Sequence, residues 1–333
     1  MYELLGICLA LAALLAINAL ASLATVALWR GLARCARRWS AATRAQVIFT
    51  LRVFPAMAAL ISVAAFLIPA YAAHEPRHTA EVVGAKLAAL ASVSAVGIAL
   101  AAWRGMAAWL ATRRLTADWL RHAEPIQVDG MAIPSYRIRH SFPVIAVVGV
   151  IRPKLFVAGH VFDSLSGEEI SAVVAHEGGH LAARDNLRRG VIRACRDVLT
   201  IVPCGQRLDR AWAEASESAA DEHGASAGAS VALDLAAALI KIARLVPEGA
   251  RPTMPAGALL IGDDPGSIGW RVHRLTQLAA AGDRPQERRA SAPSLAIWVC
   301  LYLILVAVAL TAFRPNIQVT VHAALEQIVS ALQ

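Results

Sequence analysis

The segment Ala175-His176-Glu177-Gly178-Gly179-His180-Leu181 holds the residues around which the rest of the chain is organised. In a helix, His176 and His180 lie one turn apart on the same face, because residues four apart are neighbours there. Two imidazoles at this spacing can both bind one zinc ion at about 2 Å. Glu177 lies beside them and can take a proton from a zinc-bound water. The segment therefore predicts a helix with two metal ligands and a general base, and the alternative is a solvated helix with two histidines.

The residues before this segment favour a buried helix. Ser166-Gly167-Glu168-Glu169 has the pattern of a capping box, in which the serine hydroxyl caps the helix and Glu169 reaches back to the backbone. Several apolar residues then recur at helical spacing and give the helix one apolar face. They are Ile170, Val173, Val174 and Leu181. A buried helix supplies the rigidity that a metal site requires.

A catalytic zinc ion needs a third protein ligand in addition to two histidines. Glu217 and Asp221 are four residues apart in a second predicted helix and share a face of it. Glu217 is the expected third ligand, with Glu214 and His223 as the other candidates. Asp221 is expected to accept a hydrogen bond from the second ring nitrogen of one zinc ligand, which fixes the tautomer of that histidine. The alternative for this segment is an acidic helix face without metal.

The composition indicates a membrane protein rather than a nucleic-acid-binding one. Of the 333 residues, 57% are hydrophobic and only 17% are charged, below the roughly 25% of soluble domains. The mean hydropathy is +0.54, and the net charge of +8 gives a pI near 9.8. In a membrane protein such an excess of cations marks cytoplasmic loops, and no basic patch interleaved with aromatic residues suggests nucleic acid. The five cysteines are scattered and suggest neither disulfides nor a thiolate zinc site.

Four apolar runs are long enough to cross a hydrocarbon core of about 30 Å. They cover about residues 4–29, 53–73, 87–110 and 294–313. A cleaved signal peptide is the alternative for the first run, but its leading residues are not basic and the run is too long. Arginines follow the first and third runs and precede the fourth, so the positive-inside rule places these ends in the cytoplasm. The N-terminus and the amphipathic tail 314–333 are then outside a bacterial-type cytoplasmic membrane.

Residues 113–290 are expected to form one cytoplasmic domain. Alternating segments at Ile126–Val128, Ser135–His140, Val144–Val148 and Leu155–Val157 predict a small antiparallel sheet. A short helix is expected at Leu115–His122. Besides the helix of the opening segment, further helices are expected at about 186–202, 207–227 and 231–245 and from Ser267 onwards. The segment 282–293 is polar and contains prolines, as a linker would. The predicted fold is thus mainly α, with an α+β domain anchored by four membrane helices.

The combined pattern resembles a known class of peptidases. His176-Glu177-x-x-His180 followed by Glu217-x-x-x-Asp221 is similar to the gluzincin metallopeptidases. Val148–Pro153, the run Ser166–Ala175 and Asp185 resemble one integral-membrane branch, the beta-lactam sensor-transducer (BlaR/MecR-like) peptidases. Heat-shock membrane proteases of the HtpX type are more distant relatives. The resemblance implies a zincin-type fold, one Zn²⁺ ion and peptide hydrolysis with Glu177 as the base.

Two features depart from that family. Gly178 stands where the family has a larger apolar residue, and a glycine costs a helix about 1 kcal/mol relative to alanine. The family also has a large external penicillin-binding domain after the fourth helix, whereas the chain has only the segment 314–333 there. Sensing of beta-lactams is therefore not expected.

The resemblance also suggests roles for residues beyond the ligands. Arg271, in a segment similar to a downstream family motif, is the candidate catalytic residue that stabilises the oxyanion, with His223 and His273 as weaker ones. Asp185 is expected to hold local structure near Arg188 or Arg189. His122, His140 and His160 have no partner at ligand spacing and are expected to be structural. An extended substrate is expected to pair with the sheet edge near Val144–Val148.

The sequence thus predicts a membrane-anchored zinc endopeptidase in regulatory proteolysis or signal transduction. Its expected partners are the lipid bilayer and a protein or peptide substrate, for which a transcriptional repressor is one candidate; no nucleic acid is expected. The alternatives are a signalling scaffold that keeps the zinc fold without turnover, and a quality-control protease of the heat-shock type. The sequence does not indicate the oligomeric state.

Overall fold

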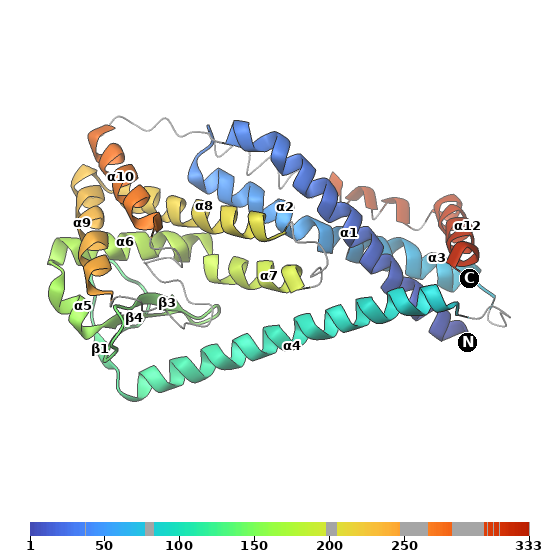
Figure 1. The fold of residues 1–333 in the computed structure, drawn as a ribbon, viewed down its shortest axis with the longest axis horizontal. Coiled ribbons are helices and arrows are strands. Elements are labelled where there is room, and N and C mark those ends of the chain that lie inside the picture. Colours follow the sequence, from blue (N-terminus) through green and yellow to red (C-terminus); the bar gives the residue numbers. More distant parts are fainter. Residues whose placement is uncertain are drawn as a thin grey trace.

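The structure is a computed structural model of the chain, and it is mainly helical with one small sheet (Figure 1). The described residues are 1–36, 38–76, 83–197, 205–246, 266–281, 303–304, 306–308, 310–312 and 314–332. The expected linker 282–293 and most of the expected fourth span 294–313 lie outside them.

In the part of the chain that the structure describes, three helical segments are long and apolar enough to cross a membrane. They are α1 (Tyr2–Ala36), the continuous helix Ala41–His74 and α4 (Ala85–Arg121), with 35, 34 and 37 residues. At 1.5 Å per residue each is roughly 50 Å long, well over the roughly 30 Å of a hydrocarbon core. Each helix therefore extends beyond any lipid that it crosses. These features indicate a membrane protein.

The second of these helices has three parts. Its first part is α2 (Ala41–Ile61), which Ser40 caps by accepting a hydrogen bond from the Thr43 N–H. A π-helical turn, η1 (Ser62–Leu67), and the short α3 (Ile68–His74) follow without a break. Pro55 and Pro69 lie within this helix, and proline and π turns are the usual sources of local bending.

Two predicted boundaries were wrong for the same reason. The second helix begins at Ala41 rather than at 53, so most of the basic segment between the first two spans is helical rather than a loop. The short helix expected at Leu115–His122 is the last part of α4. An apolar run marks only the part of a helix that suits lipid, and the helix continues wherever packing or capping supports it.

The sheet has four strands in the order β1-β2-β4-β3. These are β1 (Glu124–Ile126), β2 (Ser135–Ile138), β3 (Ile145–Val148) and β4 (Lys154–Ala158). The prediction of an antiparallel sheet was wrong in one pair, because β2 and β4 are parallel. β3 and β4 form a hairpin, and β4 rather than β3 pairs with β2. The hairpin thereby leaves β3 at the edge.

Helices cover this sheet and complete the domain. They are α5 (Gly159–Ser164), α6 (Gly167–Ala183), α7 (Asp185–Asp197), α8 (Gly205–Ala225), α9 (Ala229–Leu245) and α10 (Gly266–Ala281). The capping box at the start of α6 is confirmed: Glu169 N–H donates to Ser166 Oγ, and Ser166 N–H donates to Glu169 Oε2. The core joins the strands to the apolar faces of α6 and α9, with Phe156, Leu235 and Leu239 at its centre. This packing holds α6 firmly against the sheet.

The membrane helix α2 packs directly on α8. Ile48 and Ala45 of α2 share an apolar cluster with Trp212 of α8. At the same junction Arg52 Nε donates to Asp209 Oδ1 at 2.7 Å, and both side chains are largely buried. The α2–α8 contact therefore joins the long helices and the sheet-containing domain in one packed structure.

The tail 314–332 contains the helix α12 (Pro315–Leu332). This helix packs on the bundle of long helices. Leu325 packs with Val63 and Leu67 of η1, and Val329 packs with Leu5 and Tyr71. α12 and α3 lie together at one end of the molecule, and the sheet lies at the other (Figure 1).

Candidate metal centre

Two crossing helices form the candidate metal centre. α6 provides His176, Glu177 and His180, and α8 provides Glu217 and Asp221. The helices approach closely at Gly179, where a Cβ atom would lie 3.0 Å from Ala220 Cα and 3.1 Å from His223 Cβ. A side chain at this position would push the helices apart. No local pattern in the sequence marks Gly179, because the need for glycine arises only when α8 is packed on α6.

The surroundings of Gly178 differ from those of Gly179. A Cβ atom there would meet no other atom within 4 Å, apart from its own helix and chain neighbours. The departure from the family pattern at this position therefore leaves the packing of the site unaffected.

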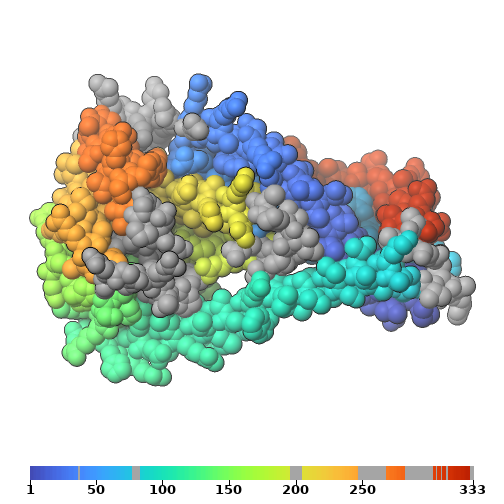
Figure 2. All heavy atoms as spheres, in the orientation of Figure 1, coloured from blue at the N-terminus to red at the C-terminus, as the bar shows by residue number. Residues whose placement is uncertain are grey.

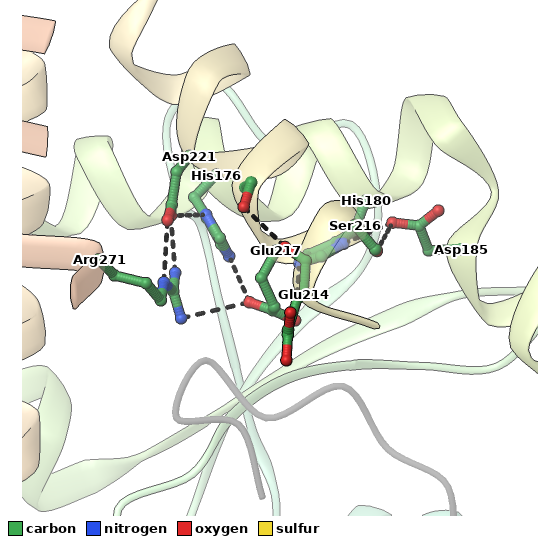
Figure 3. A network of polar contacts seen from close by, with 9 residues as sticks. His176, His180, Asp185, Glu214, Ser216, Glu217, Asp221 and Arg271 are labelled. Atoms are coloured by element: carbon green, nitrogen blue, oxygen red, sulfur yellow. Dashed lines mark hydrogen bonds and ion pairs between the residues drawn. The ribbon is translucent and has the colours of Figure 1, made fainter. Parts of the chain in front are cut away.

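The three predicted ligands lie together. One donor atom from each of His176, His180 and Glu217 lies within 4.8 Å of the other two. Glu217 Oε2 is 3.8 Å from His176 Nε2, and Glu217 Oε1 is 3.6 Å from His180 Nε2 (Figure 3). Ligands at about 2.0–2.1 Å from a tetrahedral zinc ion are roughly 3.3 Å apart. Small side-chain movements would therefore bring these three donors to a single ion.

Buried polar atoms without hydrogen bonds also fit a metal and a bound water. His176 Nε2 and both carboxylate oxygens of Glu177 are buried and have no hydrogen-bond partner among the described residues. Such groups are costly in a folded protein unless something else binds them. A cation on His176 Nε2 and a water on Glu177 would satisfy all three atoms, so the residues present fit the predicted zinc ion.

Two carboxylates orient the histidines from behind. Asp221 Oδ1 lies 3.0 Å from His176 Nδ1, at the place where the sequence predicts a carboxylate that fixes the histidine tautomer. Asp185 Oδ2 lies 2.7 Å from His180 Nδ1 and also accepts a hydrogen bond from Ser216 Oγ at 2.6 Å. Both histidines thus present Nε2 to the same space, and their rings meet nearly at right angles, with centroids 4.9 Å apart.

The expected role of Asp185 was therefore incomplete. Arg188 contributes to the low pKa of Asp185, but the closest contact of the carboxylate is with a predicted metal ligand. α6 ends at Arg184, whose left-handed conformation (φ 54°) turns the chain so that Asp185 starts α7 beside His180. The spacing of five residues between His180 and Asp185 is compatible with this contact, but the contact forms only because the chain turns sharply at Arg184.

Arg271 lies beside the ligands rather than apart from them. Its guanidinium donates from Nε to Asp221 Oδ2 at 2.9 Å and from Nη2 to Asp221 Oδ1 at 2.7 Å (Figure 3). It also lies 3.2 Å from Glu217 Oε2, and only 2% of its side chain is exposed. Arg271 therefore positions the two carboxylates of α8 from α10. Its role as oxyanion stabiliser stays a prediction.

The pKa values of Glu177 and Glu217 are shifted in opposite directions. Burial raises the pKa of Glu177 to about 7, and the side chain borders a small apolar pocket lined by residues such as Val157 and Val173. Burial also disfavours the charged form of Glu217, but His180 and Arg271 outweigh it, so its pKa is lowered. Glu177 is thus suited to exchange a proton near neutral pH, and Glu217 to stay ionised as a ligand.

The pKa values of His176 and His180 are shifted in opposite directions. Burial lowers the pKa of His176. Burial has the same effect on His180, but Glu217 and Asp185 outweigh it and raise its pKa to about 10. A cation bound between His180 and Glu217 would favour the deprotonated form of His180, because a metal ligand must lose its proton.

The remaining candidates are not members of the ligand cluster. Glu214, His223 and His273 are exposed, and none belongs to the group of residues that could hold a metal. His140 contacts the backbone of Phe142, in keeping with the predicted structural role.

An open groove of about 510 Å³ lies beside His180. The β3–β4 turn forms one wall and the α6–α7 junction the other. Asn186 Nδ2 donates to the carbonyl oxygens of Val147 and Gly149 at the edge of the sheet. An extended chain that pairs with β3, as predicted, would therefore have to replace the Asn186 contact at Val147.

The candidate centre therefore consists of three ligands on two helices, a buried carboxylate beside them, and supporting contacts from Asp185, Asp221 and Arg271. Figure 2 shows the same molecule in full, with α4 as a long ridge along one side. Searches against protein-family models and against curated proteins found no match to this chain.

Proposed function

We propose that this protein is a membrane-embedded zinc endopeptidase that cleaves a cytosolic or membrane-proximal protein. The observation that carries the proposal is the cluster of His176, His180 and Glu217 with the buried Glu177 beside it. Two histidines and one glutamate form the ligand set of a known class of catalytic zinc sites, which leave one position open for water or substrate.

Zinc bound there would supply Lewis acidity, which lowers the pKa of a bound water and polarises the carbonyl of the scissile peptide bond. Glu177 would accept a proton from that water and later donate it to the leaving amine. Its pKa of about 7 in the metal-free chain suits both transfers. A nearby cation would lower this pKa and favour the carboxylate form that accepts the proton.

The other residues hold this arrangement in place. Asp221 and Asp185 fix the tautomers of the two histidines, so that both Nε2 atoms are free of protons when a cation binds. Arg271 compensates the charge of Asp221 and Glu217 at a place where an unpaired carboxylate would be costly. The groove beside His180 offers space for an extended peptide.

The distribution of arginines supports a cytoplasmic location of the centre. Arg30 and Arg34 lie near the end of α1, and Arg113, Arg114 and Arg121 near the end of α4. In Figure 1 both helix ends point towards the part of the molecule that holds the sheet and α6. By the positive-inside rule, the proposed topology places this part in the cytoplasm and the N-terminus outside.

The test compares full-length protein with its Glu177→Gln variant in detergent or lipid discs. The variant should bind zinc as the parent does, because Glu177 is not a ligand, while proteolysis of an unfolded protein substrate falls by about 100-fold or more. A His176→Ala/His180→Ala variant should lose one equivalent of zinc relative to the parent. Proteolysis by the Glu177→Gln variant at the parental rate would refute the mechanism.

The same variant can identify the substrate. Glu177→Gln should retain bound substrate without cleaving it, so proteins captured in cells separate a dedicated regulator from a quality-control protease. One repressor-like protein indicates the first, and many unfolded membrane proteins indicate the second. The third candidate is a scaffold without turnover, and the open space around Gly178 gives no structural reason for inactivity.

A further inference from the structure

A second group of histidines and glutamates lies at the opposite end of the molecule from α6. His74 and Glu75 close α3, and His322 and Glu326 are one turn apart on α12. These two helices pack together through the apolar contacts of Leu325 with η1. The group therefore joins two segments that are far apart in the sequence but rigidly held in the fold.

The two imidazoles face each other and each has a nitrogen without a hydrogen bond. Their ring centroids are 5.7 Å apart. His74 Nε2 and His322 Nδ1 are buried and have no hydrogen-bond partner among the described residues. Buried ring nitrogens usually bond to something, and neutral imidazole nitrogens are preferred ligands of zinc, copper and nickel.

Carboxylates flank His322 on both sides. Glu75 Oε2 lies 3.9 Å from His322 Nδ1, and Glu326 Oε1 lies 3.4 Å from His322 Nε2. The side chain of Glu75 is 9% exposed and that of His322 is 15% exposed, whereas Glu326 is 63% exposed. One nitrogen of His322 therefore faces inward with Glu75, and the other faces the outer carboxylate.

This group is wider than the candidate centre on α6 and α8, whose donor atoms all lie within 4.8 Å of one another. There, the shortest contacts of histidine with glutamate are 3.6 and 3.8 Å, and the histidine rings are 4.9 Å apart. The corresponding values here are 3.9 and 5.7 Å, so this group is somewhat wider. Rotation of His74 and Glu75 towards His322 Nδ1 would close the difference. Glu326 would then orient His322 from behind, as Asp221 orients His176.

We propose that His74, Glu75 and His322 form a second binding site for a divalent transition-metal ion, with Glu326 as the outer partner of His322. The ion would join α12 to α3. With the topology proposed above, the site faces the outside of the cell. The proposal is independent of the proposed peptidase activity, since it uses none of the residues of that centre.

The experiment measures zinc binding to the full-length protein in detergent, purified with a tag that contains no histidines. Parent, His74→Gln and His322→Gln proteins are stripped with chelator, refilled, and analysed for bound zinc and for affinity by competition with a chromogenic chelator. His160→Gln, on α5 far from α12, is the matched control.

The parent and the control should bind about two zinc ions per chain, and each of the two variants about one. Affinity for the second ion should fall by about tenfold or more in the variants. The ion at His176, His180 and Glu217 should stay, and its retention also shows that the variants are folded. In a His176→Ala/His180→Ala protein, Co²⁺ should still give an absorption band that disappears when His322→Gln is added.

Two results would overturn the proposal. The first is the same zinc stoichiometry in the parent, His74→Gln and His322→Gln proteins. The second is a parent protein that binds only one zinc ion, together with a His176→Ala/His180→Ala protein that binds none. Failure of the peptidase proposal looks different, because it would appear as unchanged proteolysis in Glu177→Gln with both ions in place.

Discussion

Two neighbouring glycines in α6 allow a sharp test of how the metal centre is built. Gly178 and Gly179 are adjacent, and replacement of either by alanine adds the same single methyl group. In a helix interior, this change alone stabilises a protein by about 1 kcal/mol. The structure predicts opposite outcomes, because the surroundings of the two glycines differ.

At Gly178 the new methyl group meets open space, so the gain from helix propensity should be retained. We expect Gly178→Ala to raise the free energy of unfolding by about 1 kcal/mol, which corresponds to roughly 2 °C in Tm for a chain of this size. Zinc affinity should not change.

At Gly179 the methyl group would lie 3.0 Å from Ala220 Cα, a backbone atom that moves only with α8. Overpacking of this kind costs about 1–3 kcal/mol, which offsets or exceeds the gain from helix propensity. More specifically, α8 would have to shift away from α6, and Glu217 with it. Misplacement of reacting groups on this scale lowers activity by tens of fold, up to about 100-fold for 1 Å.

The assay is a thermal unfolding scan of parent, Gly178→Ala and Gly179→Ala proteins in the same detergent, with zinc affinity measured alongside. Gly178→Ala should be more stable than the parent, and Gly179→Ala should be less stable than Gly178→Ala and bind zinc more weakly. If both variants gain stability equally and bind zinc as the parent does, the close crossing of α6 and α8 does not control the site.

Three further predictions concern the groups around the ligands. Asp185→Asn should weaken zinc binding by about 10–100-fold, since the amide orients His180 poorly. The control Asp163→Asn, which changes an exposed ion pair, should leave zinc binding unchanged. Equal zinc affinities of the two variants would refute the role of Asp185. Arg271→Met should lower the free energy of unfolding by about 3–5 kcal/mol, because it leaves a buried carboxylate unpaired. In denaturant unfolding, Arg274→Met should lower this free energy clearly less, because its ion pair is more exposed. In the metal-free protein the pKa of Glu177 is raised from 4.5 to about 7, so its contribution to stability is complete below pH 4.5 and is lost as the pH rises through 7. Glu177→Gln should therefore stabilise the metal-free protein above pH 7, by at most about 3 kcal/mol, and not at pH 4; a pH-independent effect in unfolding experiments would contradict this.

Local spacing in the sequence predicted much of the candidate site. Residues four apart share a helix face whatever the rest of the fold does, so His176 and His180 were assigned to one ion, and Glu217 and Asp221 to one face of α8. The capping box at Ser166 was equally local and is present. The apolar runs indicated long membrane helices for the same reason, although not the residues at which they begin and end.

Contacts between distant segments could not be predicted in this way. The pairing of Arg271 with Asp221 joins residues that are 50 positions apart, and no period in the sequence marks it. The parallel pairing of β2 with β4 depends on where the β3–β4 hairpin docks, and the buried Arg52 depends on the packing of α2 against α8. Each of these is decided when whole elements pack, because only then are the buried charges and strand edges matched.

The sequence by itself determined which side chains can bind a metal and which can move a proton, since chemistry and helical spacing are local properties. Tertiary structure alone decided that α8 approaches α6 closely enough at Gly179 for Glu217 to reach both histidines, and that Asp185 and Arg271 support them. The physical reason is that a metal centre needs ligand atoms within a few ångströms, and such distances between separate helices are set by packing.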